Sequence, residues 1–177
     1  MSKTIIAAAM AFVLCFCAAH THSAAVAVIE EINSQNSSVY PDVDENIWCY
    51  DAILTMHEKG IMTGMSDGTF APLDCVTRSQ FAVMLHRMAG LPEAASVSPF
   101  EDVAAGEWYA DAVIWASQKG IITGYEDPGG SHTRFGPYDY ITREQMAVML
   151  FRYAVKERYD TTGRGLLTKF SDSSSVS

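Results

Sequence analysis

Two segments of this chain repeat one sequence pattern, and a third copy begins near the C-terminus. Residues 40–64 match residues 100–124 at 10 of 25 positions, and residues 70–89 match residues 135–154 at 12 of 20 positions. Phe170 opens the third copy. Unrelated segments would match at roughly one position in 16. An internal repeat of this length means that each copy is one supersecondary unit, which buries its apolar face against its neighbours.

The first residues of the chain have the pattern of a secretory signal peptide. A short basic start precedes an uncharged apolar run from Thr4 to Ala19, and small residues that permit cleavage follow it. An uncleaved membrane anchor is the alternative, but the run is short of the about 20 residues that a span needs. The expected divisions are a signal peptide (1–27), a linker (28–39), repeat 1 (40–90), a linker (91–99), repeat 2 (100–154), a linker (155–169) and a truncated start of repeat 3 (170–177).

The charge balance of the chain is acidic. Its 12 Lys and Arg residues stand against 21 Asp and Glu residues, which gives a formal net charge of −9 at pH 7. A surface of this sign repels nucleic acid and anionic lipid, so neither nucleic acid nor a membrane is an expected partner after signal cleavage. The balance still permits an anionic ligand that is held in a local basic pocket.

Two cysteines, Cys49 and Cys75, remain once the signal peptide is removed. Their counterparts in repeat 2 are Tyr109 and Tyr140, and this paired exchange suggests that the two positions are neighbours in space. In an oxidising compartment such a pair favours a disulfide. Two small buried thiols are the alternative, and a zinc site is not expected without a Cys-x-x-Cys motif.

The first half of each repeat predicts an amphipathic helix, over about 47–59 and 107–119. Apolar residues recur there at the i, i+4, i+5 and i+8 positions of one helix face. Gly60 and Gly120 follow directly, and glycine readily adopts the left-handed conformation that ends a helix. The shared Lys-Gly-Ile motif is therefore interpreted as helix termination.

The second half of each repeat predicts another helix, which begins at Thr77 and at Thr142. In both copies Thr is followed three residues later by Gln, which is the spacing of a capping box. An apolar face rich in methionine follows, and its methionines are better explained by core packing than by a cofactor site. Each repeat is therefore expected to be helix, loop, helix.

Arg78 and Arg143 occupy the first turn of these second helices, where a cation opposes the helix dipole at a cost of about 0.3–1 kcal/mol. One explanation is internal: Arg78 pairs with an aspartate such as Asp42 or Asp102. The other is external: the guanidinium and the free helix amides together receive an anionic or polyhydroxyl ligand. The residues alone leave both explanations open.

Four more recurring residues have a structural and a binding interpretation. Trp48 and Trp108 stand at the start of the first helix. Core packing is the expected role of these side chains, and stacking on a sugar ring is the alternative. Asp42 and Asp102 precede that helix, and capping it is their expected role.

Catalytic patterns are weak in this sequence. None of the histidines recurs between the repeats, and no nucleophile elbow, zinc-protease motif or phosphate loop is present. The acidic segment after Pro41 lacks the Gly and Glu that a calcium loop requires. No enzyme activity, metal or cofactor is expected.

With these motifs in place, the chain resembles the S-layer homology domain family over nearly all of residues 40–154. The match is carried by an aromatic-x-Asp-Val entry, a Trp, a Gly-Ile-x-x-Gly segment, an Asp-Gly-x-Phe-x-Pro loop and a Thr-Arg-x-Gln helix start. In repeat 1 these are Tyr40-Pro41-Asp42-Val43, Trp48, Gly60-Ile61-Met62-Thr63-Gly64, Asp67-Gly68-Thr69-Phe70-Ala71-Pro72 and Thr77-Arg78-Ser79-Gln80.

The resemblance implies a mainly α fold, in which tandem repeats form part of a pseudo-threefold helical bundle with ligand grooves between repeats. It implies a noncatalytic anchor that binds secondary cell-wall polysaccharide, often carrying acidic pyruvate ketals, at a bacterial cell surface. Met65 replaces the aromatic residue that repeat 2 keeps as Tyr125, so a weaker first groove is expected. The ligand-binding residues that it implies are Asp42, Trp48, Gly64, Arg78, Asp102, Trp108, Gly124 and Arg143.

Two alternative functions stand beside this one. The same surfaces could pair with a third repeat on another chain, which would make the chain a self-assembly module of an S-layer. The chain could also be the anchoring fragment of a larger secreted enzyme, because nothing in its own residues supplies a catalytic site.

Overall fold

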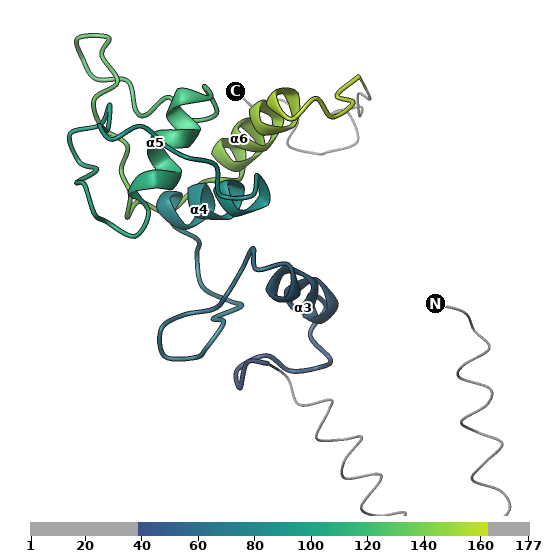
Figure 1. Cartoon of the computed structure of the whole chain (residues 1–177). Coiled ribbons are helices and arrows are strands. Elements are labelled where there is room, and N and C mark those ends of the chain that lie inside the picture. Colours follow the sequence, from purple (N-terminus) through teal and green to yellow (C-terminus); the bar gives the residue numbers. More distant parts are fainter. Residues whose placement is uncertain (1–38, 163–177) are drawn as a thin grey trace, which may run out of the picture. The chain divides into compact units, whose positions relative to one another are not determined.

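The fold is that of a computed structural model, which describes residues 39–162. The predicted signal peptide, nearly all of the linker after it and the third repeat lie outside these residues. Within them the protein is mainly α, with two isolated β-bridges and no strand, which confirms the predicted class. The helices, labelled in Figure 1, are α3 (Tyr50–Glu58), α4 (Arg78–Met88), α5 (Ala110–Gln118) and α6 (Arg143–Lys156).

The first helix of each repeat begins three residues later than the sequence predicted. Successive turns precede α3 instead: the Ile47 amide donates to the Asp44 carbonyl at 3.0 Å, and the Tyr50 amide donates to the Ile47 carbonyl at 3.0 Å. No side chain caps the first amides of α3 or α5. As a result Trp48 lies in a turn before α3 rather than on its apolar face.

The predicted ends of the first helices are confirmed. Gly60 and Gly120 have φ angles of +66° and +67°, in the left-handed region. The amide of the isoleucine that follows each glycine donates back into the helix, at 2.9 Å in repeat 1 and 2.8 Å in repeat 2. These bonds satisfy carbonyls that the end of a helix otherwise leaves unpaired.

The predicted starts of the second helices are also confirmed. Thr77 accepts a hydrogen bond from the Gln80 amide at 3.2 Å, and the Gln80 side chain accepts one from the Thr77 amide at 2.8 Å. Thr142 and Gln145 make the same reciprocal pair at the start of α6.

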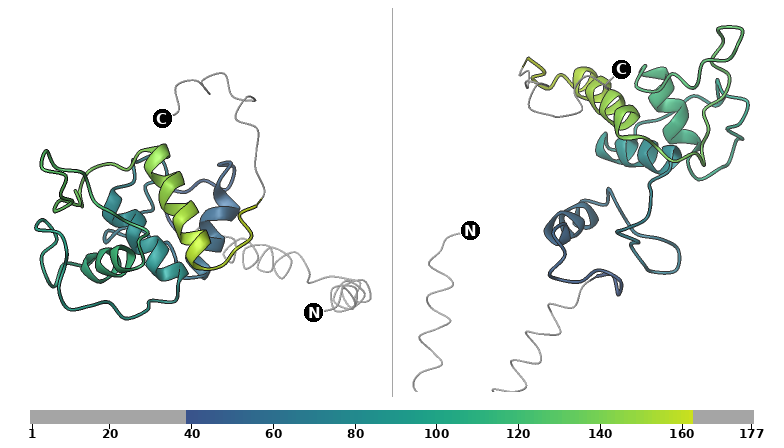
Figure 2. Two further views of the ribbon diagram at one scale, coloured as in Figure 1. Left: turned by 90° about the horizontal axis from the view of Figure 1, so that it is seen from above. Right: turned by 180° about the vertical axis from the view of Figure 1, so that it is seen from behind.

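The main hydrophobic core joins the two repeats. The second helix of repeat 1, α4, packs on the first helix of repeat 2, α5, and the two lie side by side in each view of Figures 1 and 2. Residues of α6 complete this core. Its largest buried side chains include Phe81 and Leu85 of α4, Trp115 of α5, Phe135 of the loop, and Met149 and Tyr153 of α6. A separate small cluster surrounds α3 and contains Tyr40, Val43 and Ile53.

The structure does not contain the disulfide that the cysteine exchange suggested. Cys49 and Cys75 are free thiols, and Cys75 is exposed. The inference assumed that Tyr109 and Tyr140 are neighbours. Tyr109 instead packs edge-to-face against Tyr138, with ring centroids 5.8 Å apart. Because Tyr138 stands two residues before Tyr140, the position that faces Cys49 by analogy is that of Leu73, not of Cys75.

None of the helices in the described part of the chain combines the length and the apolar character that crossing a bilayer would require.

Candidate functional site

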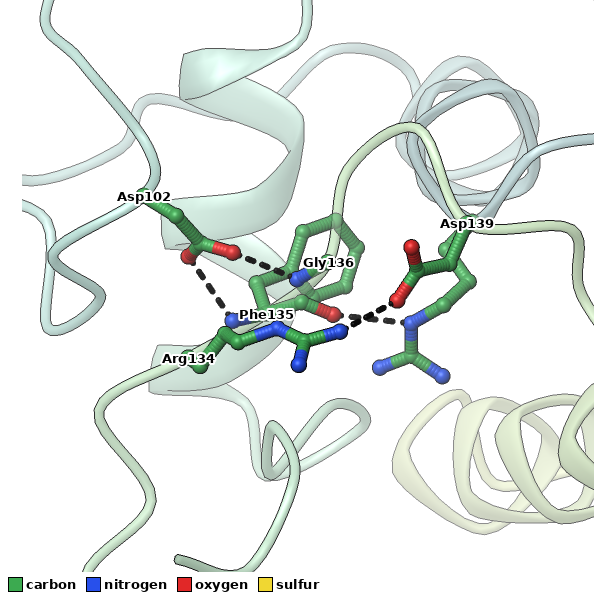
Figure 3. A network of polar contacts seen from close by, with 6 residues as sticks. Asp102, Arg134, Phe135, Gly136 and Asp139 are labelled. Carbon is green, nitrogen blue, oxygen red and sulfur yellow. Dashed lines mark hydrogen bonds and ion pairs between the residues drawn. The ribbon is translucent and has the colours of Figure 1, made fainter.

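The loop of repeat 2 is held in place by a carboxylate from the entry of the repeat. Asp102 accepts hydrogen bonds from the amides of Phe135 at 2.8 Å and Gly136 at 2.7 Å, as Figure 3 shows. The expected capping of the first helix is therefore wrong. No side chain caps α5, and Asp102 instead ties the start of the repeat to the end of the loop.

Asp42 does the same in repeat 1, where the expected capping role is also wrong. It accepts from the amides of Phe70 at 2.9 Å and Ala71 at 2.7 Å. These bonds, the one from Phe70 foremost, lower the pKa of the Asp42 carboxyl below its usual value. Both loops are thus built on the same pair of backbone bonds.

Arg78 reaches from α4 into the loop of repeat 2. It is only 3% exposed, and its Nε donates to the carbonyl oxygen of Phe135 at 2.8 Å. Its guanidinium carbon lies 4.4 Å from the ring centroid of Tyr125 and 4.9 Å from that of Phe135. Burial lowers the pKa of Arg78. The internal explanation, an ion pair with Asp42 or Asp102, is not what the structure has, since a backbone carbonyl accepts from the guanidinium instead.

The first amides of α4 are also occupied by repeat 2. The amide of Arg78 donates to the Asp139 carbonyl at 2.9 Å, and the amide of Ser79 donates to the Pro137 carbonyl at 3.1 Å. The free helix amides that the external explanation required are therefore not available at α4. These carbonyls place negative partial charge at the start of α4, and the Phe135 carbonyl does so at the guanidinium, which together offset the unfavourable position of a cation there.

Tyr125 is held between two arginines. The guanidinium carbon of Arg134 also lies close to this ring, 4.9 Å from its centroid. Arg134 belongs to the loop of repeat 2, whereas Arg78 comes from α4. Arg134 also pairs with Asp139 at 2.7 Å, but both side chains are about half exposed. A surface pair of this kind stabilises little, at most about 1 kcal/mol. Its role is to orient Arg134 along the tyrosine ring.

A groove of about 250 Å³ opens beside this cluster. Its walls are Arg78, the segment 121–125, and one side of α6. The residues of α6 that line it are Glu144, Gln145, Val148, Met149 and Arg152. Arg152 is anchored by a long 3.4 Å bond to the carbonyl of Ile121. The groove therefore combines two cations, one carboxylate, a tyrosine and several apolar side chains in a chain that is acidic as a whole.

Of the eight residues predicted to bind ligand, Arg78 and Gly124 line this groove. Gly124 has a φ of +70°, and a side chain there would lie 2.7 Å from the Phe100 ring and 2.8 Å from the Arg134 carbonyl. It is therefore required by the backbone as well. The others lie elsewhere: Asp102 supports the loop, Asp42 and Gly64 belong to repeat 1, Arg143 is exposed on α6, and Trp48 and Trp108 stand before their helices.

The two tryptophans are not core residues, contrary to the prediction. Trp48 is 93% exposed and Trp108 is 60% exposed. The sequence reasoning also missed Arg152, although a signal was present. Arg87 recurs as Arg152, and each binds a carbonyl of the Gly-Ile segment, Arg87 at 3.1 Å from Ile61.

Among residues 39–162, no group of three or more His, Cys, Asp or Glu side chains is arranged to hold a metal ion.

Comparison with known proteins agrees with this architecture. A family model described as the S-layer homology domain matches residues 39–82 and 99–147. The chain is 35% identical over 147 residues to an endoglucanase of Bacillus sp. (strain KSM-635), covering 82% of the chain and 15% of that protein. It is 34% identical over 144 residues to exoglucanase XynX of Acetivibrio thermocellus, covering 81% of the chain and 12% of that protein.

An S-layer protein of Bacillus licheniformis is 30% identical over 134 residues, which cover 75% of the chain and 14% of that protein. The chain thus spans no more than 15% of the length of any of these three relatives. On the family match to both helix-loop-helix units, the chain belongs to the S-layer homology (SLH) domain family.

Proposed function

We propose that this chain is a noncatalytic anchor that binds an acidic secondary cell-wall polysaccharide, noncovalently, in the groove beside Arg78. The main support for this proposal is the fixed orientation of the Arg78 guanidinium. Its Nε donates to the carbonyl of Phe135 and its guanidinium lies against the Tyr125 ring, so its orientation is fixed and its two terminal amino groups are not used by that bond. Because Arg78 lines the groove, these groups offer a fixed pair of donors to a carboxylate.

The rest of the groove fits a pyruvylated sugar. The ketal carboxylate would take the Arg78 donors, and Arg152 would add a second cation in the lining of the groove. Val148 and the Tyr125 ring would cover the apolar face of the sugar. The exposed Trp48 and Trp108 could stack on further residues of the glycan outside the groove. The counterpart site in repeat 1, around Asp42 and Gly64, would bind more weakly because it has Met65 in place of tyrosine.

A second candidate is more specific about what is anchored. Relatives that share this region are named as an endoglucanase and an exoglucanase, and the chain spans a small part of each. The repeats would then hold a secreted polysaccharide-degrading enzyme at the bacterial surface. In either case we expect the chain to be secreted and to reside at the cell wall.

Binding to purified cell walls tests the proposal. Arg78→Lys keeps the charge but removes the planar pair of donors, so we expect binding at least about 10-fold weaker than that of the unaltered chain. Arg158→Lys is the matched control, since Arg158 is exposed and lies outside the groove. Walls whose ketals have been removed by mild acid should lose binding of the unaltered chain. Equal binding of Arg78→Lys and the control, with unchanged circular dichroism, would refute the proposal.

A further inference from the structure

One carboxylate lies among the cations of the groove beside Arg78. Three of the residues that line this groove carry a charge at neutral pH: Arg78, Arg152 and Glu144. They bring two positive charges and one negative charge, a net charge of +1. A groove that only had to attract a polyanion would gain from cations alone, because a carboxylate weakens its positive field. The presence of Glu144 therefore needs a separate explanation.

The start of α6 does not require a glutamate at this position. Glu144 is the second residue of α6, and the capping box of that helix is complete with Thr142 and Gln145. The counterpart of Glu144 in repeat 1 is Ser79, which is fully buried at the start of α4. A glutamate gains a small charge–dipole stabilisation near a helix start, but α4 begins with the same capping box and has no acidic residue in its first turn.

The groove offers hydrogen-bond donors and one charged acceptor. The Arg78 guanidinium is held by a 2.8 Å bond to the Phe135 carbonyl. The Arg152 guanidinium is held by a 3.4 Å bond to the Ile121 carbonyl. Guanidinium groups only donate hydrogen bonds, whereas an ionised carboxylate only accepts them. A ligand that satisfies all three charged side chains therefore presents one acid group and, beside it, hydroxyl or amide N–H donors.

We propose that Glu144 determines the specificity of this groove. Its carboxylate accepts hydrogen bonds from hydroxyl or amide N–H groups of the sugar that carries the acid, while the acid itself binds at Arg78. The same carboxylate excludes phosphodiester polymers, in which every unit of the backbone is charged and a second anion would lie beside Glu144. This role rests on the proposed function of the groove and deepens it, because it selects carboxylated sugars among acidic polymers.

The size of the groove keeps a bound group within reach of all three charges. A compact volume of 250 Å³ is only about 6 Å across, which is shorter than the screening length of about 8 Å at physiological salt. Salt therefore screens Glu144 only in part from an anion that is bound at the arginines. A like charge in such a position weakens binding of the wrong partner, so selectivity comes from repulsion as well as from attraction.

Equilibrium binding of the purified chain to two polymers of similar length, near physiological salt, tests this role. One polymer is the acidic wall polysaccharide with its pyruvate ketals, and the other is poly(glycerol phosphate). We expect the unaltered chain to bind the ketal polymer at least about 10-fold more tightly than the phosphodiester. Glu144→Gln keeps the shape and an acceptor but removes the charge, so its affinity for poly(glycerol phosphate) should rise at least about 5-fold. Glu144→Ala also removes the acceptor, so it should bind the ketal polymer at least about 3-fold more weakly than Glu144→Gln does.

Glu157→Gln is the matched control, because it makes the same change of charge at the exposed C-cap of α6, outside the groove. It should bind both polymers like the unaltered chain, and every variant should keep its circular dichroism spectrum. The role of Glu144 is overturned if Glu144→Gln keeps the selectivity of the unaltered chain, or if the control loses selectivity equally. It is also overturned if Glu144→Ala binds the ketal polymer as well as Glu144→Gln, or if the unaltered chain binds both polymers alike.

Arg78→Lys separates these results from the proposed function. If Arg78→Lys binds the ketal polymer more weakly than the unaltered chain, the proposed function stands, even where the Glu144 variants show no effect. If it binds the ketal polymer equally well, the proposed function fails, and the role of Glu144 fails with it.

Discussion

Replacement of Asp102 by alanine tests whether one carboxylate builds the loop that receives Arg78. Asp102 is half-buried and accepts two amide bonds of 2.8 Å and 2.7 Å, and the residues that donate them, Phe135 and Gly136, are buried. A hydrogen bond to a charged group contributes about 1.5–3 kcal/mol, and partial exposure favours the lower end of that range. Because alanine leaves both amides without an acceptor, we expect Asp102→Ala to lower the free energy of unfolding by about 2–4 kcal/mol.

Urea unfolding followed by circular dichroism measures this change, with Asp42→Ala as the matched control. Asp42 makes the equivalent two bonds, but they are exposed to solvent, so the loss there should be clearly smaller. Asp102→Ala should also weaken wall binding, since the loop that orients Arg78 is no longer held. A loss below about 0.5 kcal/mol, or one no larger than that of Asp42→Ala, would show that the loop is held by other contacts.

Three further predictions concern stability at low protein concentration, each measured by denaturant or thermal unfolding. Gly120→Ala should lower the free energy of unfolding by about 1 kcal/mol, because Gly120 has a φ of +67° but lies in open space. Gly124→Ala should lower it by at least about 2 kcal/mol more, because the new side chain would collide with a ring and a carbonyl. Equal losses would contradict the close packing at Gly124. Leu85→Ala should cost about 2–5 kcal/mol and Leu150→Ala less than about 1 kcal/mol, since the first is fully buried and the second 41% exposed; similar losses would show that α6 is already covered. The lowered pKa of Asp42 means that its contribution to stability is complete above the ordinary aspartate pKa of about 3.9 and is lost as the pH falls below that value. The urea concentration at the unfolding midpoint should therefore decrease as the pH is lowered below about 4, and Asp42→Asn should make this decrease smaller. An unchanged pH dependence in Asp42→Asn would contradict the role of the two amide bonds.

Local patterns in the sequence predicted the elements of this fold well. The capping boxes at Thr77 and Thr142, and the glycines after the first helices, depend on contacts within a few residues, and the structure has them where they were predicted. The starts of the first helices were placed three residues too early. Apolar periodicity there included Trp48, whose side chain is exposed in a turn, so the period alone could not show where the helix begins.

The site was less predictable, because its parts come from different repeats. A cation at a helix start indicated that a partner or a ligand exists, and the partner in the structure is the carbonyl of Phe135, 57 residues away. Backbone acceptors leave no trace in residue identity, so the aspartates seemed to be the natural partners. Likewise, Cys49 and Cys75 seemed paired because their counterparts are both tyrosines. In the structure the two thiols are free, and Tyr109 packs against Tyr138.

The most direct test of glycan binding in the groove is a titration of the ¹⁵N-labelled chain with purified acidic wall polysaccharide, followed by amide chemical shifts. We expect the largest shifts at the groove, at Gly124, Tyr125 and Gln145, and their loss in Arg78→Lys. Shifts that instead cluster around Trp48 and Trp108, with the groove amides unchanged, would contradict the account. They would place the polysaccharide on the exposed turns before α3 and α5.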